Sequence, residues 1–330
     1  MRILLTGATG YIGGAVAEAL VQAGHAVLSL ARSDDQARTL AAKGLGAHRG
    51  DLRDPASLAE GARHADAVIH AAQATGNDTG QVDRAAIEAI IGALAQGNRP
   101  FVYTSGCWVA GNTGGKAADE DTPLARTPLV AWHPANERLV LGAARQGVQG
   151  IVLRPAMVYG RGGGLVMSFV QSAREHGAAR VIGDGRNRWT FVHQDDLADL
   201  YVRALAAPAG TLLYAAHGPA IRVRDVAAAA SRASGAGGRV ETVPIRCRSR
   251  KRARLWGHSP MPWRSISRYP ASDPSECWAG GPMVRRCSRI WRVGWRRWRH
   301  APPRGFSPAK SRGRDARLPG IPRTDPCERS

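Results

Sequence analysis

Short apolar segments alternate with longer amphipathic segments along the first 244 residues of the chain. In the longer segments, apolar residues recur at three- and four-residue spacing, which predicts helices with one buried face. In the short segments the apolar residues form near-continuous runs, which are typical of strands buried in a parallel sheet. The alternation predicts an α/β fold, with a doubly wound, Rossmann-like parallel sheet covered by crossover helices.

The predicted elements follow this alternation. Strands are expected at Arg2–Thr6, Ala26–Ala31, Ala47–Gly50, Ala67–His70, Pro100–Thr104 and Gly150–Arg154. Helices are expected at Ile12–Ala23, Asp34–Ala42, Asp83–Ala95 and Pro134–Gln146. After Pro155 the pattern loosens into Gly-rich loops, with further helices near Val166–His176, Asp195–Ala206 and Val223–Ala233.

A glycine-rich loop, TGATGYIG at Thr6–Gly13, follows the first predicted strand, and the first helix begins inside it. Gly7 permits the tight turn, Gly10 lets the backbone approach a pyrophosphate, and Gly13 lets the helix pack closely on the strand. The start of the helix offers N–H groups and a positive dipole end to phosphate oxygens. We therefore predict a dinucleotide-binding domain over residues 1–160 and a small, incomplete substrate-side subdomain over 161–244, interleaved with the sheet.

The end of the second predicted strand distinguishes the two nicotinamide cofactors. Sheets that prefer NAD carry an acidic residue here, which accepts hydrogen bonds from the ribose hydroxyls. This strand ends in Ala31-Arg32-Ser33, without a carboxylate. Arg32 offers a charged planar fork and Ser33 a hydroxyl, and both suit a 2′-phosphate. We predict NADP(H), with NAD left open because Asp34 and Asp35 follow directly and Arg32 could be a solvated loop residue.

The composition changes abruptly after Pro244. Residues 245–330 contain 22 Lys and Arg against 5 Asp and Glu, so this segment carries +17 of the net charge of +20. It also holds six of the nine Trp, four of the five Cys and eleven of the twenty Pro residues. The remaining charge of +3 over the first 244 residues gives no reason to expect a specific nucleic-acid or membrane partner there.

The segment 245–330 is predicted to be a frameshifted or disordered tail, because helical periodicity disappears as Arg, Trp, Pro and Cys become frequent. Reading GC-rich codons for Pro244–Phe306 from each third base gives a string with helical periodicity and balanced charge, followed by a stop. Under any codon choice, Cys277-Trp278 then yields Leu and Trp278-Ala279 yields Gly. A genuine basic extension and a nucleic-acid-binding tail are the alternatives, although no binding motif supports the latter.

Cysteine content and hydropathy indicate in which cellular compartment the protein is expected. Cys107 is the only cysteine before Pro244, which argues against a disulfide framework and fits a reducing cytoplasm. Later cysteines lack the paired spacing of a metal site, so no metal is expected. No apolar run reaches the roughly 20 residues needed to cross a bilayer, and Met1 leads directly into a strand. We expect a cytoplasmic protein.

Six short motifs occur in an order and spacing that are specific at the level of a protein family. They are the GxxGxxG loop, Gly50-Asp51-Leu52, Val68–Ala72, Val102–Ser105, Arg154-Pro155 through Val158-Tyr159-Gly160, and Phe191–Asp196. With them, residues 1–244 resemble the extended and atypical short-chain dehydrogenases/reductases of the NAD-dependent epimerase/dehydratase family. The resemblance implies an NAD(P)-dependent oxidoreductase or epimerase that acts on a small carbonyl, hydroxyl or nucleotide-sugar substrate, and it leaves a homodimer open.

The resemblance also implies the cofactor contacts. Asp51 and Leu52 would flank the adenine, while Ala71 and Ala72 would lie along the pyrophosphate and ribose. Pro155 would border the nicotinamide. Simpler roles stay open, with Asp51 in a turn and the alanines in packing. The full cofactor-binding set is Gly7, Thr9, Gly10, Tyr11, Ile12, Gly13, Arg32, Ser33, Asp51, Leu52, Ala71, Ala72 and Pro155.

The catalytic pattern of the family is incomplete. Its active members use a Tyr as acid/base with a Lys four residues later, and no Tyr in this chain has such a Lys. Ser105 fits the group that polarises the substrate oxygen. His133, at the expected start of the catalytic helix, is the best substitute proton carrier, although a structural role is its alternative. Cys107 is interpreted as a buried packing residue.

Other polar groups near the expected site have weaker assignments. Asp195 and Asp196 are interpreted as an N-cap and a first-turn carboxylate rather than as catalytic groups. The loop Gly160–Gly164 and Asn187-Arg188-Trp189 either line the substrate site or lie in plain surface loops. Two hypotheses follow: an NADP(H)-dependent enzyme for a small-molecule substrate, or a non-catalytic NADP(H)-binding redox sensor or partner-binding module.

Overall fold

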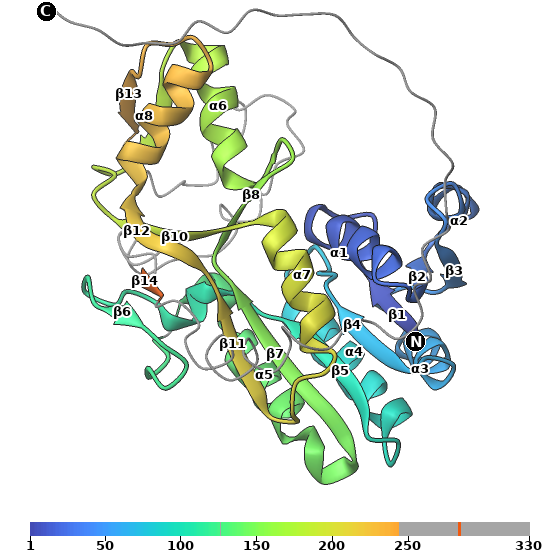
Figure 1. Ribbon diagram of the computed structural model, residues 1–330. Coiled ribbons are helices and arrows are strands. Elements are labelled where there is room, and N and C mark those ends of the chain that lie inside the picture. The colour runs from blue at the N-terminus through green and yellow to red at the C-terminus, as the bar shows by residue number, and fades with distance from the viewer. Residues whose placement is uncertain (126, 244–282, 285–330) are drawn as a thin grey trace, which may run out of the picture. The chain divides into compact units, whose positions relative to one another are not determined.

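The central feature of the computed structural model is a seven-stranded sheet, with the strand order β11-β7-β5-β4-β1-β2-β3 (Figure 1). The structure describes residues 1–125, 127–243 and 283–284. All neighbouring strands of this sheet run parallel, which confirms the predicted doubly wound, Rossmann-like fold. The strands are β1 (Arg2–Thr6), β2 (Ala26–Ala31), β3 (Gly46–Arg49), β4 (Ala67–His70), β5 (Arg99–Thr104), β7 (Val148–Pro155) and β11 (Thr211–Ala215).

Helices cover both faces of the sheet because successive side chains of a strand point in opposite directions. Ile3 and Leu5 pack with α1 (Tyr11–Gln22), α2 (Asp34–Ala41) and α7 (Gln194–Ala204) in one buried cluster. Leu4 lies in the cluster on the other face, with α3 (Pro55–Arg63), α4 (Thr79–Leu94) and α5 (His133–Gly142). Figure 1 shows α1 and α7 side by side, and these two helices are in contact.

A smaller substrate-side portion contains the elements that lie outside the main sheet. Its helices, α6 (Gly164–His176) and α8 (Val223–Ala233), pack against each other. A three-stranded sheet has the order β12-β10-β8, and β13 pairs with β9. The bounds are β8 (Met157–Gly160), β9 (Ala179–Ile182), β10 (Arg188–His193), β12 (His217–Arg222) and β13 (Val240–Val243). Two short strands, β6 (Ala117–Ala118) and β14 (Met283–Val284), form a further pair.

The two portions are interleaved more deeply than a boundary at residue 160 suggests. The helix expected near Asp195–Ala206 is α7, which packs on α1 over the main sheet rather than in the substrate-side portion. Strand β11 returns to the edge of the sheet beside β7. The sequence prediction for 245–330 lies outside the described residues, apart from 283–284. Among the residues that the structure describes, no helix combines the length and apolar character needed to cross a membrane.

Candidate functional site

The loop between β1 and α1 leaves no space for side chains at two of its glycines. Gly7 has φ +82°, and a Cβ there would lie 2.7 Å from the carbonyl oxygen of Ala71 at the end of β4. A Cβ at Gly13 would lie 2.1 Å from the carbonyl oxygen of Gly7. These contacts bring the N-terminus of α1 and the end of β4 against the same short loop. The structure thus builds the close approach that a pyrophosphate cradle requires.

The first turn of α1 keeps its N–H groups available. Its N-cap is Gly10, and no side chain within the described residues caps this turn. Thr9 and Gly10 are exposed, while Tyr11 and Ile12 are half-buried. Unpaired N–H groups and the positive dipole end of a helix favour a phosphate at this position. The residues present therefore fit the dinucleotide that the loop motif predicts.

The end of β2 carries an unbalanced positive charge. The two acidic residues after Ser33 are paired with other arginines: Asp34 lies 3.4 Å from Arg49, and Asp35 contacts Arg38. Arg32 itself is exposed, and within the described part of the chain it has no carboxylate partner. The Ser33 hydroxyl accepts a hydrogen bond from the backbone N–H of Gln36 and so caps α2.

The remaining cofactor candidates lie at the ends of β3, β4 and β7. The Asp51 carboxylate accepts a hydrogen bond from the backbone N–H of Arg53. This contact is typical of a turn, which is the alternative role that the sequence left open for Asp51. Leu52, Ala71 and Ala72 are half-buried. Pro155, by contrast, is buried. Because all these residues follow the carboxyl ends of parallel strands, the topology brings them to one edge of the sheet, where ligands of such folds bind.

Ser105 belongs to a buried ionic cluster. Its hydroxyl donates to Glu137 Oε1 at 2.6 Å, and only 8% of the residue is exposed. Glu137 also accepts both arms of a fork from Arg154, at 2.9 and 2.6 Å. The guanidinium of Arg154 donates further to the Tyr214 hydroxyl at 3.1 Å. The hydroxyl that the sequence assigned to the substrate oxygen is thus already bound to a carboxylate.

His133 is the first residue of α5 and lies at the end of a second buried polar chain. Its Nδ1 lies 2.7 Å from the Tyr103 hydroxyl, which donates to Asp83 Oδ2 at 2.6 Å. Asp83 Oδ1 lies 3.0 Å from Nε2 of His70, and His70 Nδ1 lies 2.7 Å from the Thr6 hydroxyl. These hydrogen-bonded side chains therefore connect the end of β1, beside the phosphate loop, to the start of α5.

Burial and charge shift the protonation of these groups. Burial lowers the pKa of His133 below its ordinary value. Burial and the neighbouring Asp83 charge raise the pKa of Tyr103 well above its ordinary value. Burial opposes ionisation of Asp83, yet the hydrogen bonds from His70, Tyr103 and Asn136 hold its pKa below the ordinary value. At neutral pH, Asp83 is thus a carboxylate, Tyr103 a neutral phenol and His133 a neutral imidazole.

Asp83, Tyr103 and Asn136 were not predicted as site residues from the sequence. One signal could have found Asp83, because it shares a helix face with Ile87 and Ile90 at spacings of four and seven residues. An acidic residue on an apolar face needs buried partners, since an unpaired buried charge is strongly unfavourable. The identity of those partners depends on strands that are distant in the sequence.

Cys107 and the two acidic residues of α7 have structural surroundings. Burial raises the pKa of the Cys107 thiol to about 12, so this thiol is unreactive. Asp195 and Asp196 both lie in the first turn of α7, as the sequence suggested, but the N-cap is His193. The His193 ring accepts a hydrogen bond from the backbone N–H of Asp195, which leaves the Asp195 carboxylate for Arg161.

The loop at Gly160–Gly164 connects the substrate-side portion to the phosphate loop. The Tyr11 hydroxyl donates to the Gly160 carbonyl at 2.9 Å. Arg161 pairs with Glu18 on α1 and, at 2.6 Å, with Asp195 on α7. A Cβ at Gly163 would lie 2.2 Å from the Tyr11 ring. The loop therefore packs directly over the start of α1.

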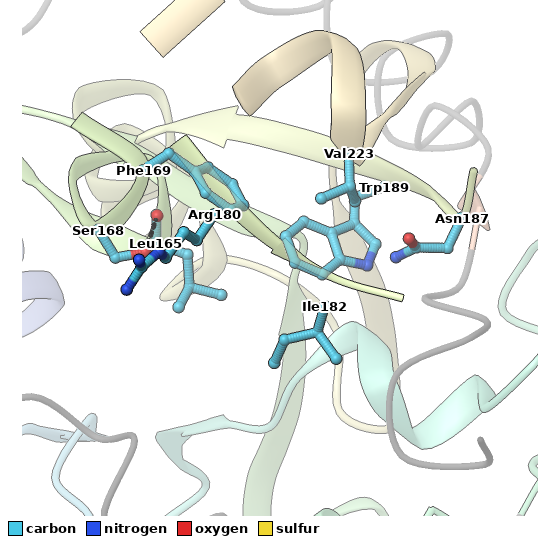
Figure 2. Close-up of a pocket in the computed structure, with 8 residues that line it drawn as sticks. All are labelled: Leu165, Ser168, Phe169, Arg180, Ile182, Asn187, Trp189 and Val223. Carbon is cyan, nitrogen blue, oxygen red and sulfur yellow. Dashed lines mark hydrogen bonds between the residues drawn. The ribbon is translucent and has the colours of Figure 1, made fainter. Parts of the chain in front are cut away.

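A small pocket of about 20 Å³ lies in the substrate-side portion. Figure 2 shows the Trp189 ring between Asn187 on one side and Phe169 with Leu165 on the other. Its lining is mainly apolar and consists of Leu165, Ser168, Phe169, Arg180, Ile182, Asn187, Trp189 and Val223. The volume suffices for about one water molecule. Of the predicted substrate-lining residues, Asn187 and Trp189 line this pocket.

Known proteins resemble the chain in sequence and structure. Residues 3–213 match the NAD dependent epimerase/dehydratase family. An uncharacterised protein of Schizosaccharomyces pombe is 34% identical, over 69% of this chain and 78% of its own length. The 2-alkyl-3-oxoalkanoate reductase of Stenotrophomonas maltophilia is 29% identical, over 68% and 73%. A Thermus thermophilus UDP-glucose 4-epimerase solved with NAD superposes with a TM-score of 0.63 at 24% identity, covering 74% of this chain and 86% of the epimerase.

Proposed function

Because the chain belongs to the NAD dependent epimerase/dehydratase family, we propose that it is an NADP(H)-dependent oxidoreductase interconverting a small carbonyl compound and its alcohol. The observation that carries the cofactor choice is the charge at the end of β2. Asp34 and Asp35 are paired with other arginines, so the positive charge of Arg32 is available to a 2′-phosphate. The hydroxyl of Ser33 lies beside it, at the positive end of α2.

Two groups of the chain act on the substrate oxygen in this proposal. His133 exchanges a proton with it, since its imidazole is the titratable group at the start of α5 and the pKa is below the ordinary value. Ser105 donates a hydrogen bond to it once its hydroxyl leaves Glu137. When bound, the nicotinamide supplies or takes up the hydride. Pro155, at the end of β7, would border the nicotinamide ring.

The proposed carbonyl substrate is supported by a relative rather than by the pocket in the substrate-side portion. Five of the eight residues that line this pocket are apolar, but its volume of about 20 Å³ holds only about one water molecule and no substrate. The relative from Stenotrophomonas maltophilia is named as a 2-alkyl-3-oxoalkanoate reductase, which supports a carbonyl compound as the substrate.

A non-catalytic NADP(H)-binding module is the second candidate function. The bond between Ser105 and Glu137 favours it, because the hydroxyl is not free to polarise a substrate. The missing Tyr-Lys pair favours it as well. In that case the phosphate loop and Arg32 would still bind NADPH tightly, and the polar groups beside them would serve only to stabilise the fold.

An anaerobic assay of the full chain separates these functions. NADPH absorbance is followed with a panel of simple ketones, 3-oxoalkanoate esters and UDP-glucose, and NADPH and NADH binding is measured in parallel by calorimetry. We expect NADPH to bind more tightly than NADH and to be consumed with carbonyl compounds. Tight NADPH binding with no turnover of any compound would favour the non-catalytic module. Equal affinity for the two cofactors would count against the role of Arg32.

A further inference from the structure

Four buried side chains and the half-buried His133 form a continuous hydrogen-bonded network. In order they are Thr6, His70, Asp83, Tyr103 and His133, and each consecutive pair lies within 3.0 Å. Thr6 ends β1 and His70 ends β4, so one end of the chain flanks the point where the strand order of the sheet reverses. His133 at the start of α5 forms the other end.

The donor and the acceptor of the hydrogen bonds around Asp83 can be assigned in turn. Asp83 is ionised, so every neighbour must donate to it: Tyr103 and Asn136 to Oδ2, and His70 to Oδ1. His70 therefore donates from Nε2, and its Nδ1 lies 2.7 Å from the Thr6 hydroxyl. The Thr6 oxygen in turn accepts from the backbone N–H of Ala72. Each donor on this side of Asp83 is satisfied.

The same assignment determines the state of His133. A tyrosine hydroxyl has one proton, and Tyr103 donates it in the hydrogen bond to Asp83. Its oxygen can then only accept from His133 Nδ1, which lies 2.7 Å away. Within the described part of the chain, no hydrogen bond engages His133 Nε2. In the neutral ring, Nε2 carries the lone pair.

We propose that Asp83 and Tyr103 are positioning residues that lock His133 in the tautomer protonated on Nδ1, so that Nε2 exchanges the proton of the substrate. The proposal deepens the oxidoreductase function and, for its catalytic part, rests on it. A third group that orients an imidazole and fixes its tautomer is a recurrent way to prepare a base. Here that role is divided between a phenol and a buried carboxylate.

The step balances as a proton and a hydride transfer. In alcohol oxidation the O–H bond of the substrate breaks, its proton forms a bond to His133 Nε2, and its electron pair becomes the second C=O bond. The hydride leaves the same carbon for bound NADP⁺. In carbonyl reduction the imidazolium returns the proton from Nε2 to the oxygen as the hydride arrives at the carbon. Tyr103 keeps its proton throughout.

The pH dependence follows from the groups that face His133. These are Asp83 on α4, Tyr103 on β5, His70 on β4 and Glu137 on its own helix. Burial lowers the pKa of His133, and the charges of Asp83 and Glu137 oppose this without reversing it. Alcohol oxidation needs the neutral ring. As the pH is lowered, its rate should therefore stay constant to a pH below about 6.5, the ordinary pKa of imidazole, and then fall. Carbonyl reduction needs the protonated ring and rises as the pH falls through that range.

The tautomer can be measured without any turnover. The full chain is labelled with ¹⁵N-histidine, and two-bond ¹⁵N–¹H correlation spectra at pH 8 distinguish rings protonated on Nδ1 from those protonated on Nε2. The chain has ten histidines, so the His133 signals are assigned by their loss in His133→Gln. Tyr103→Phe removes the acceptor of the Nδ1 proton. Tyr201→Phe is the matched control, since its buried hydroxyl bonds to Thr104 and not to His133.

We expect His133 to be protonated on Nδ1 in the unmodified chain and in Tyr201→Phe. In Tyr103→Phe it should shift towards the Nε2-protonated form, with NADPH affinity unchanged and turnover reduced at least tenfold. A ring protonated on Nε2 in the unmodified chain overturns the proposal, as does an unchanged tautomer in Tyr103→Phe. If Tyr103→Phe does not fold, the unmodified chain alone decides. Absence of turnover in every form would reject the oxidoreductase function while leaving the tautomer result readable.

Discussion

Arg32 differs from the other arginines around α2 because no carboxylate neutralises it among the described residues. Arg32→Asp should therefore weaken NADPH binding and favour NADH relatively. A hydrogen bond to a charged group contributes about 1.5–3 kcal/mol, which corresponds to roughly a 10- to 100-fold loss in affinity. Calorimetric titration with both cofactors measures the change.

The matched control for this prediction is Arg38→Ala. Arg38 is also exposed and lies in the last turn of α2, where it pairs with Asp35 on the same helix. Its replacement should leave the ratio of the two affinities unchanged. An equal loss of NADPH affinity in both variants would indicate a general effect of positive charge rather than recognition of the 2′-phosphate by Arg32.

Single residues of the site were predictable from sequence where a local motif decides their environment. The glycines at Gly7 and Gly13 occupy the tight approaches that their spacing predicts. The surroundings of Ser105 were not predictable, since Glu137 and Arg154 reach it from α5 and β7. The same holds for Tyr103, whose partners come from α4 and α5. A buried polar group takes its partners from the fold rather than from its neighbours in sequence.

Helix α1 offers a direct test of the phosphate cradle. In Gly13→Ala the new Cβ would lie 2.1 Å from the Gly7 carbonyl oxygen, so the helix must move away from the loop. We expect a loss of about 1–3 kcal/mol in the free energy of unfolding, as for other overpacked sites, together with a loss of NADPH binding. Urea unfolding and calorimetry report the two effects.

Gly14→Ala provides the control one residue along the same helix. Its Cβ would lie 3.5 Å from the Ala8 carbonyl oxygen, which is an ordinary contact. Because alanine favours a helix over glycine by about 1 kcal/mol, this variant should be as stable as the unmodified chain or more so. NADPH binding that survives Gly13→Ala would show that the loop does not approach the cofactor as described.

The buried pair of Glu137 and Arg154 joins α5 to β7, and both side chains are at most 3% exposed. Glu137→Gln should lower the free energy of unfolding by about 3–5 kcal/mol, because it leaves the guanidinium buried without a counter-charge. The double variant with Arg154→Met should recover part of this loss. Glu88→Gln, in an exposed pair with Arg84, should cost less than about 0.5 kcal/mol. Similar losses in both single variants would contradict the stabilising role of the buried pair.

Elements of the main sheet were predicted more accurately than those of the substrate-side portion. Strands β1, β2 and β4 have the predicted bounds because each is a buried apolar run. Helix α3 was missed although Asp54 caps it and Pro55 begins it, which is a recognisable start signal. Strands such as β12 are mostly exposed and carry no apolar run, so pairing in the fold rather than local sequence determines them.

At the scale of the whole molecule, we propose that residues 245–330 result from a change of reading frame near Pro244. The charge of +17 in this segment and the forced Leu-Gly from Cys277-Trp278-Ala279 in the alternative frame motivate the proposal. Resequencing the gene from its source should reveal a one-base insertion or deletion near the codon of Pro244. A clean sequence that confirms the present frame, with protease resistance of residues 245–330 in the purified protein, would reject it.

Two exposed ion pairs connect the loop at Gly160–Gly164 to α1 and α7, in addition to its contacts with Tyr11. The side chains of Arg161, Glu18 and Asp195 are 40%, 53% and 51% exposed, so water and salt reach both ion pairs. Exposed pairs contribute about 0–1 kcal/mol, and the Debye length shrinks from about 10 Å at 0.1 M salt to about 3 Å at 1 M. The loop should therefore open more often as ionic strength rises. If a dinucleotide binds at the start of α1, its residence time would then depend on the surrounding electrolyte as well as on the protein.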